Sequence, residues 1–465
     1  MATTITQKPL YNQLPVGQEV IFTISNPNIV ALYTNTTFQA DVYISNGTPP
    51  TITGTPLATF KTKPNNAGVG IFDFRQVVES YVASDNLATT GSSYKSSITN
   101  IIPNHPIHLI DKYSKNTNAM RWLRIEFKTV YTVSGSVIID TPISSVNYRL
   151  FNGYLKYDDV LDLQNINFGY DLSQFKLDSD TKSFLTNAPT TQFANLEDYG
   201  TVSFLDSSND LSSIILKYYN SSGVQIGTEN VSQNVINGGG FSATQDIQRN
   251  MFYFGCFPAN LRSYGTTVGT PTLFQSLVTA GTIQGGHYTF QAFKTVSTNF
   301  VTQEYRINLN CPNLKGYESI RLCWLNQWGA WDYYTFTQKS TRNISTKGST
   351  YEQLAGTWND SSYRANGFKG GKKTFRVNAT EKIKMNTDFV SENDNVMFEE
   401  LTNSPEVYIL AKYSNVFDVT TVLNQYVTPV RITSTNFTKK TVANDKLIQY
   451  TFEVEKSKTL RTQSI

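Results

Sequence analysis

The stretch RLCWLNQWGAWDYYTFTQ, residues 321–338, decides how this chain folds. Strand-like alternation places Leu322 and Trp324 on one face of a first strand. In the same way, Tyr334 and Phe336 share one face of a second strand, and LNQWGAWD connects the two. The stretch therefore predicts a β-hairpin made of bulky aromatic side chains.

Four aromatic side chains of this hairpin are candidate contact residues. Tryptophan and tyrosine offer a large apolar area with a polar group, so they can stack on sugars or bury in a protein partner. The same side chains could instead cap the core of a β-sandwich, and the residue types alone leave both alternatives open. The candidate interface or glycan contacts are Trp324, Trp328, Trp331 and Tyr333.

The composition of the whole chain favours the same class of structure. Charged residues make up 16% of the 465 residues and aromatic residues 13%, which is typical of a globular chain and not of a disordered one. The frequent Thr, Tyr, Phe, Val and Ile side chains fit a pleated, half-buried surface. We expect an all-β protein with a few short helices, organised as several β-sandwich domains of the immunoglobulin-like type.

The length of the chain corresponds to about three domains at roughly 150 residues each. We expect an N-terminal β-sandwich domain over residues 1–150 and a second β-sandwich domain with long loops over residues 151–340. A C-terminal β-rich domain should follow over residues 341–465. Short helices are expected after Asp73, which stands in the N-cap position, and within residues 391–402.

Basic residues gather in one place, although the net charge of the chain is small. A formal charge of +3 does not argue for nucleic-acid binding by the whole chain. The densest basic group lies on a predicted hairpin and could face nucleic acid or an acidic partner. Because only Phe368 and Phe375 interleave with the cations, a solvated hairpin is the simpler interpretation. The candidate basic patch consists of Lys369, Lys372, Lys373, Arg376, Lys382 and Lys384.

The sequence lacks the residue patterns of catalytic and metal sites. His105 and His108 share a proline-broken loop without a third ligand nearby. The cysteines Cys256, Cys311 and Cys323 have no CxxC spacing and are expected as small buried side chains in a reducing cytosol. The chain contains no GxSxG elbow, and no phosphate-binding glycine motif in a strand-to-helix setting. We therefore expect no catalytic residue, no cofactor and no metal ion, and a protein that is not an enzyme.

Adjacent carboxylates are the one feature that would suit a polysaccharide depolymerase. Asp158 with Asp159, or Glu399 with Glu400, could in principle act as acid and base in glycoside cleavage. Neighbouring residues on a strand point to opposite faces, however, and neighbours on a helix are usually solvated. A depolymerase is therefore the least favoured function.

The first residues, MATTITQKPL, lack the charged and apolar regions of a secretory signal. No run of sequence approaches 18 apolar residues, so no membrane span is expected. These two features predict a product that stays in the cytosol where it is made.

Several blocks of sequence carry a family resemblance. They are WLNQWGAWDYYTF, KSFLTNAPTTQF, DYGTVSFL and NDKLIQYTFEVEKS, together with ADVYIS and ATFKTKPNNAGVGIFDF near the N-terminus. These blocks resemble virion structural proteins of tailed phages that infect Bacteroidetes, including the crAss-like phages, and the likeness is spread over most of the chain. For Asn326, Gly329, Asp332 and Phe336 the resemblance implies a hairpin scaffold and not a catalytic role.

The resemblance also implies a function. It implies a virion protein that assembles in several copies in the tail or neck, as a ring around the tail barrel. Its partners would be other copies of itself and other virion proteins, it would be made in the host bacterial cytoplasm, and nucleic acid is not an expected partner. One alternative is a tail-associated adhesin that binds host surface glycans through Trp328 and Trp331, and the other is a capsule depolymerase.

Overall fold

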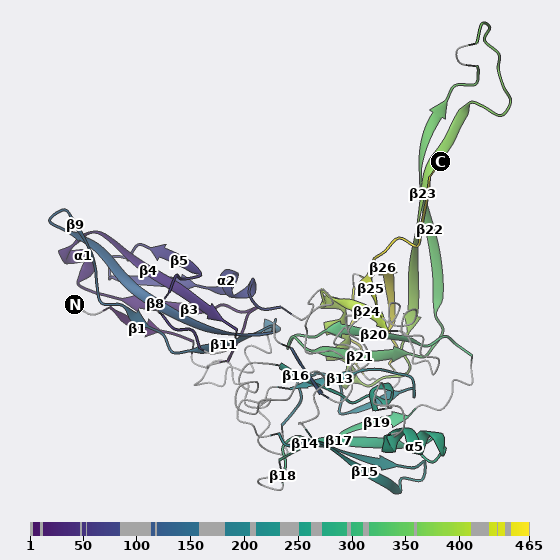
Figure 1. Cartoon of the computed structure of the whole chain (residues 1–465), viewed down its shortest axis with the longest axis horizontal. Coiled ribbons are helices and arrows are strands. Elements are labelled where there is room, and N and C mark those ends of the chain that lie inside the picture. Colours follow the sequence, from purple (N-terminus) through teal and green to yellow (C-terminus); the bar gives the residue numbers. More distant parts are fainter. Residues whose placement is uncertain are drawn as a thin grey trace. The chain divides into compact units, whose positions relative to one another are not determined.

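Strands dominate the structure, and its helices are short. The predicted mostly β class with a few short helices is confirmed, and the strands of the described residues form five sheets (Figure 1). The computed structural model describes residues 3–9, 13–46, 49–52, 54–83, 113–116, 119–157, 182–204, 211–232, 251–261, 272–294, 299–309, 316–357, 360–410, 427–434, 436–441 and 448–464.

The chain divides into two compact units. Unit 1 comprises Met1–Cys311 and Leu325–Asp332, and unit 2 comprises Pro312–Trp324 and Tyr333–Ile465. The turn of the 321–338 hairpin therefore belongs to unit 1, while most of its two strands belong to unit 2. The three-domain boundaries expected from the sequence stay predictions.

Unit 1 begins with two sheets that share one core. The smaller sheet has the order β1 (Thr4–Gln7), β3 (Ile21–Ser25) and β6 (Val69–Asp73). The larger sheet has the order β2 (Gln13–Pro15), β11 (Tyr148–Phe151), β8 (Met120–Val133), β4 (Thr34–Ser45) and β5 (Ala58–Thr62), with β9 (Ser136–Ile139) and β10 (Ile143–Ser144) paired to β8. Their pairings are antiparallel except that of β2 with β11, which is parallel.

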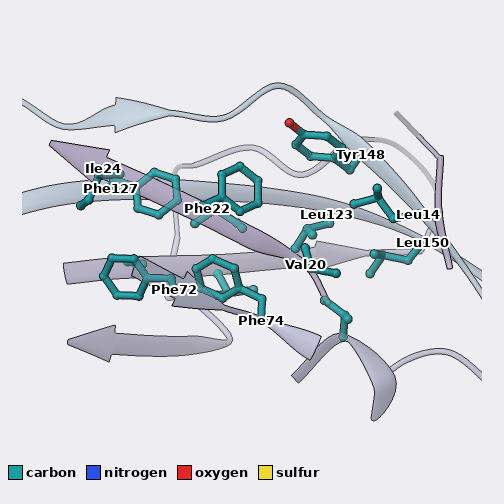
Figure 2. Close-up of a cluster of buried hydrophobic side chains, with 14 of the residues drawn as sticks. Leu14, Val20, Phe22, Ile24, Phe72, Phe74, Leu123, Phe127, Tyr148 and Leu150 are labelled. Carbon is teal, nitrogen blue, oxygen red and sulfur yellow. The ribbon is translucent and has the colours of Figure 1, made fainter. Parts of the chain in front are cut away.

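Aromatic side chains join these two sheets. Residues of β3 are alternately buried and half-buried, as expected of a strand with one face on the core. Phe22 of β3 packs against Phe127 of β8 with ring centroids 5.4 Å apart, and Tyr148 of β11 meets Phe22 edge-on at 5.7 Å (Figure 2). Each such fully buried side chain contributes about 1.5–3 kcal/mol through the hydrophobic effect.

Short helices close this core. Helix α1 (Ile29–Leu32) buries Ile29, and α2 (Arg75–Glu79) buries Val78. The N-cap expected at Asp73 is wrong by one residue, because Phe74 occupies that position. The Asp73 carboxylate nevertheless accepts a hydrogen bond from the Arg75 amide at 3.0 Å, so it still satisfies a free amide of the first turn.

The rest of the described part of unit 1 contains two more sheets and two short helices. One sheet has the order β12 (Thr191–Ala194), β19 (Tyr305–Leu309), β17 (His287–Lys294), β14 (Ser213–Tyr219) and β15 (Gln225–Ser232), with β18 (Asn299–Phe300) paired to β17. The other has the order β13 (Thr201–Phe204), β16 (Met251–Gly255) and β7 (Tyr113–Asn116). The helices are α4 (Pro258–Leu261) and α5 (Leu273–Thr279).

Unit 2 is built on one large sheet. Its order is β21 (Trp331–Phe336), β20 (Ile320–Leu325), β24 (Val407–Leu410), β25 (Val427–Ile432), β26 (Thr451–Lys456), β23 (Gly371–Asn386) and β22 (Thr341–Gln353), with β27 (Arg461–Ser464) paired to β23. The hairpin predicted over residues 321–338 is therefore present as β20 and β21. The capped helix predicted over residues 391–402 is also present, as the turn η2 (Glu392–Asp394) followed by α6 (Asn395–Asn403).

Strands β22 and β23 form a long hairpin, which we call the arm. Its ladder runs from Thr341 opposite Lys384 to Gln353 opposite Gly371, with one register shift between Ser349 and Thr350. On its other edge, β23 pairs with β26 between Lys382 and Asn386 and with β27 between Arg376 and Ala379, so the arm extends beyond β26 and is two-stranded only past Arg376 (Figure 1, upper right).

Candidate functional site

The turn between β20 and β21 is fixed by the side chain of Asn326. Its Oδ1 accepts hydrogen bonds from the amides of Trp328 and Ala330, both at 3.0 Å. Its Nδ2 donates to the carbonyl oxygen of Leu185 and to the Asp332 carboxylate, also at 3.0 Å. Because all four of these bonds are buried, the turn is held in one conformation.

Two other segments of unit 1 bind the same turn. The Tyr154 amide donates to the Gln327 carbonyl at 2.8 Å, and the Lys156 amide donates to the Gln327 side chain at 3.1 Å. On the other side, Trp328 Nε1 donates to Asn187 Oδ1 at 3.4 Å. These contacts occupy the polar groups of the turn in structural bonds, which agrees with the scaffold role implied for Asn326.

Asp332 is a buried carboxyl group in this network. Thr186 Oγ1 and Asn326 Nδ2 donate to its two oxygens. Burial raises the pKa of Asp332 from 3.8 to about 6, because the hydrogen bonds that favour the charged form only partly offset the loss of hydration. The group is therefore poised to change its charge in mildly acidic solution.

The four candidate aromatic residues are all buried. Trp324, Trp328, Trp331 and Tyr333 are each no more than 3% exposed. Tyr333 also lies under the Arg321 guanidinium, whose carbon is 5.3 Å from the ring centroid. This burial favours the core-packing alternative, and it gives no support to stacking of Trp328 or Trp331 on a glycan. A role of these side chains in contacts with a partner stays a prediction.

The candidate basic patch is divided between two parts of unit 2. Lys382 and Lys384 lie at the base of the arm, where their strand partners on β26 are Glu455 and Glu453. Lys382 Nζ is 3.6 Å from a Glu453 oxygen. The charge of the basic patch is therefore partly neutralised at the base.

The cations further along the arm gather on one of its two faces. Cross-strand partners share one face of a hairpin, and Arg376 and Lys373 of β23 lie opposite Ser349 and Tyr351 of β22. Because these two partners are two residues apart, both cations lie on one face, together with Lys347. That face of the arm contains five cations and no acidic residue, from Lys384 at the base to Lys373 near the tip.

A β-bulge produces this clustering. Ser349 is opposite Arg376 whereas Thr350 is opposite Thr374, so Phe375 has no partner in the ladder. The extra residue shifts the alternation of β23 by one position and brings Lys373 to the same face as Arg376. Lys372 then lies on the other face, opposite Glu352.

The remaining patch residue, Lys369, lies in the tip of the arm beside exposed aromatic rings. Its ammonium group is 5.8 Å from the Phe368 ring centroid. Phe368 is 75% exposed and Tyr363 is 72% exposed. Sequence reasoning noted Phe368 but missed Tyr363 and Lys347, because neither belongs to the dense run of lysines. Exposed aromatic residues thus lie on the arm and not in the tryptophan-rich turn.

The described histidine and cysteine side chains, which could in principle serve catalysis or metal binding, lie in packed surroundings. His287 stacks on Tyr219 at 4.6 Å, and burial lowers the pKa of its imidazole. Cys256 and Cys323 are buried free thiols, as expected, whereas Cys311, His105, His108, Asp158 and Asp159 lie outside the described residues. In the described part of the chain, no three His, Cys, Asp or Glu side chains are grouped to hold a metal ion.

A search of the described helices for a membrane span found none of sufficient length and apolarity. Comparison with family models and with curated proteins found no match to this sequence.

Proposed function

We propose that this chain is a structural subunit of a tailed-bacteriophage virion, a tail or neck ring component that assembles in several copies around the tail barrel. The resemblance of its sequence blocks supports this function. The observation that carries the proposal is the arm, because β22 is exposed along almost its whole length and the part of the arm beyond Arg376 is a two-stranded hairpin. A hairpin without a third strand is only marginally stable in water, so contacts with other chains explain an arm that extends this far.

The proposal covers the architecture as well. We assign the first two sheets of unit 1 to an immunoglobulin-like β-sandwich, which is supported by the packing of Phe22 against Phe127 between the sheets. Such sandwiches serve as rigid modules that present loops and hairpins to neighbours. In this proposal the protein is not an enzyme, needs no cofactor, is made in the host cytoplasm and resides in the virion with other tail or neck proteins.

The experiment is quantitative mass spectrometry of purified phage particles, combined with gold labelling of the same particles by an antibody to this chain. The proposal predicts a fixed number of copies per particle, with gold at the neck or tail. A chain that is abundant in infected cells but missing from washed particles would overturn it.

In the glycan-binding alternative, the binding residues lie at the tip of the arm and not in the turn that contains Trp328. The exposed rings of Tyr363 and Phe368 at the tip of the arm are its supporting observation, since glycan binding commonly uses solvent-facing aromatic side chains. A glycan array probed with the whole protein and with a Tyr363→Ala, Phe368→Ala variant tests this function. Binding that the variant loses would favour an adhesin, and no binding by either protein would end this alternative.

The depolymerase alternative gains little from the structure. Glu399 and Glu400 are half-buried on α6, and Glu399 forms an ion pair with Lys439 at 2.6 Å. A carboxylate held in an ion pair is stabilised in its charged form and is poorly suited to act as a general acid.

A further inference from the structure

A strongly acidic segment lies in the same unit as the basic arm. Residues 386–406, which contain η2 and α6, include no Lys or Arg. We call these residues the acidic segment, and its six carboxylates are Asp388, Glu392, Asp394, Glu399, Glu400 and Glu406. Lys439 pairs with Glu399 at 2.6 Å and offsets part of the charge of the segment. The segment still has a net negative charge.

The acidic segment also has an apolar component. Phe389 is 59% exposed and Val396 is 40% exposed. Asp388 and Glu392 lie close to them in sequence and are exposed as well. An exposed apolar group surrounded by charge of one sign is typical of a protein-binding surface.

The distal arm, residues 347–376, has the opposite character. Its basic side chains outnumber its acidic ones, and its apolar groups Tyr363 and Phe368 are more exposed than Phe389. The basic residues are Lys347, Arg364, Lys369, Lys372, Lys373 and Arg376, and the acidic ones are Glu352 and Asp360. The distal arm and the acidic segment are therefore complementary both in charge and in exposed apolar surface.

Within one molecule these two surfaces are far apart. The acidic segment is anchored at the base of the arm, because Thr387 N donates to the Tyr450 carbonyl at 2.9 Å and Phe398 packs on Phe452 at 5.5 Å. Phe452 in turn is the strand partner of Met385. Arg376 lies nine residues further along β23, which corresponds to about 30 Å at roughly 3.3 Å per residue. The ladder is continuous between Lys384 and Arg376, and this prevents the arm from folding back over that distance.

We propose that the distal arm of one copy binds the acidic segment of a second copy of this chain. The inference rests on the proposed assembly of several copies and names the contact that joins them. Because the two surfaces differ, the contact is head-to-tail, and each copy offers one arm and one acidic segment. Repetition of such a contact gives a closed ring or an open filament, depending on the rotation between copies.

The first test is the self-association of the full chain measured by sedimentation velocity. At about 50 mM salt we expect oligomers, and at about 500 mM salt we expect dissociation, because exposed charges are screened over a few ångströms at high ionic strength. A chain that stays monomeric at about 100 µM in low salt would overturn the inference, since even a weak interface would show association there. That result would leave the particle measurement above as a separate test of the function.

Charge-reversal variants test whether the distal arm forms the contact between copies. The arm variant Lys347→Glu, Arg376→Glu changes two exposed cations on one face, and we expect it to weaken self-association by at least about tenfold. The matched control is Lys61→Glu, Lys63→Glu, which makes the same change of net charge at exposed positions of unit 1 and should associate like the parent. Equal weakening by both variants would contradict a specific contact.

Mixing two defective variants tests the head-to-tail geometry. The acidic-segment variant Asp388→Lys, Glu392→Lys keeps an intact arm, while the arm variant keeps an intact acidic segment. Each alone should self-associate at least about tenfold more weakly than the parent, and an equimolar mixture should form dimers and nothing larger at the concentration where each alone is monomeric, because only one complementary pair of intact surfaces remains. Circular dichroism and thermal melting of each variant establish that it is folded. A mixture that stays monomeric, or an arm variant whose self-association equals that of the parent, would overturn the proposal.

Discussion

Gly329 lies so close to the backbone of Asn152 that a Cβ on Gly329 would be 2.0 Å from the Asn152 carbonyl oxygen. Gly329 also has a φ of +73°, a backbone conformation that side chains with a Cβ rarely adopt. The turn between β20 and β21 therefore requires glycine at this position for two independent reasons.

Replacement of Gly329 by alanine should destabilise unit 1. The backbone conformation alone costs about 1–3 kcal/mol for a residue with a Cβ, and the close contact with Asn152 adds to this cost. We expect a clear fall in the midpoint of thermal unfolding. The control is Gly135→Ala, where φ is +84° but no atom lies within 4 Å of the added Cβ. Equal losses in the two variants would show that the contact with Asn152 has no role.

Asp332 should make the stability of unit 1 depend on pH. A folded-state pKa of about 6 lies above the unfolded value of 3.8, so the folded chain holds the proton more tightly. The free energy of unfolding contributed by this group is then greatest below about pH 4 and falls, by up to about 3 kcal/mol, as the pH rises through 6.

Asp332→Asn removes this titration. Urea unfolding between pH 4 and pH 7 should show the stability difference shifting in favour of the variant as the pH rises. Other carboxyl groups titrate equally in both proteins and cancel in the difference. A difference that does not change with pH would contradict the raised pKa.

Glu381 should stabilise the base of the arm at neutral pH, whereas the contribution of Asp332 is greatest in acid. Its carboxylate pairs with Arg342 and Lys456, each at 2.6 Å. Burial alone would raise the pKa of Glu381, but these two cations outweigh it and hold the pKa below 4.5. The stabilisation is present above pH 4.5 and is lost as the pH falls through the lowered pKa.

Glu381→Gln removes the buried partner that Arg342 and Lys456 share. Because Arg342 keeps its pair with Glu318 and both cations are partly exposed, we expect a loss of about 1–2 kcal/mol at neutral pH. Glu453→Gln is the comparison. Glu453 is only half-buried and lies 3.6 Å from Lys382, so its replacement should cost no more than about 1 kcal/mol. Hydrogen exchange of β22 and β23 amides, measured for both variants, would reveal the loosening. Similar protection in the two proteins would argue against a special role for Glu381.

Phe127 should be among the most sensitive positions of the N-terminal core. It packs against Phe22, Phe72 and Phe74, with ring centroids 5.4–6.2 Å apart. Phe127→Ala should cost about 3–5 kcal/mol by leaving a cavity between the two sheets. Ile139→Ala, at a position that is 60% exposed, should change the stability by less than about 0.5 kcal/mol. Denaturant midpoints of the two variants that differ little would contradict the shared core.

Local features of the fold could be predicted from the sequence. Alternation of Leu322 and Trp324 marked the first strand of the hairpin, and the Ser391 side chain marked the start of a helix through its capping box with Asp394. These predictions succeed because the interactions that decide them join residues only a few positions apart.

Features that depend on distant residues could not be predicted in this way. Trp328 is buried, and its indole N–H donates a hydrogen bond to Asn187, which lies 141 positions earlier and which no local pattern reveals as a partner. The arrangement of the basic patch depends on the bulge at Phe375. Without the bulge, simple alternation along β23 would place Lys373 and Arg376 on different faces of the arm. The sequence predicted most of the cations of the basic patch, but it did not predict which of them lie on the same face of the arm.

The path of the chain also limits how the protein can be divided. The polypeptide passes from unit 1 to unit 2 after Cys311, returns for Leu325–Asp332, and leaves again at Tyr333. A single cut therefore cannot release either unit intact, and a fragment that starts at Tyr333 would lack β20 and the first residues of β21. Expression of the C-terminal part alone should give a protein with an incomplete sheet edge. A protease that nicks one connection should give two fragments that stay together through non-covalent packing, because at least one unit then contains residues from both fragments.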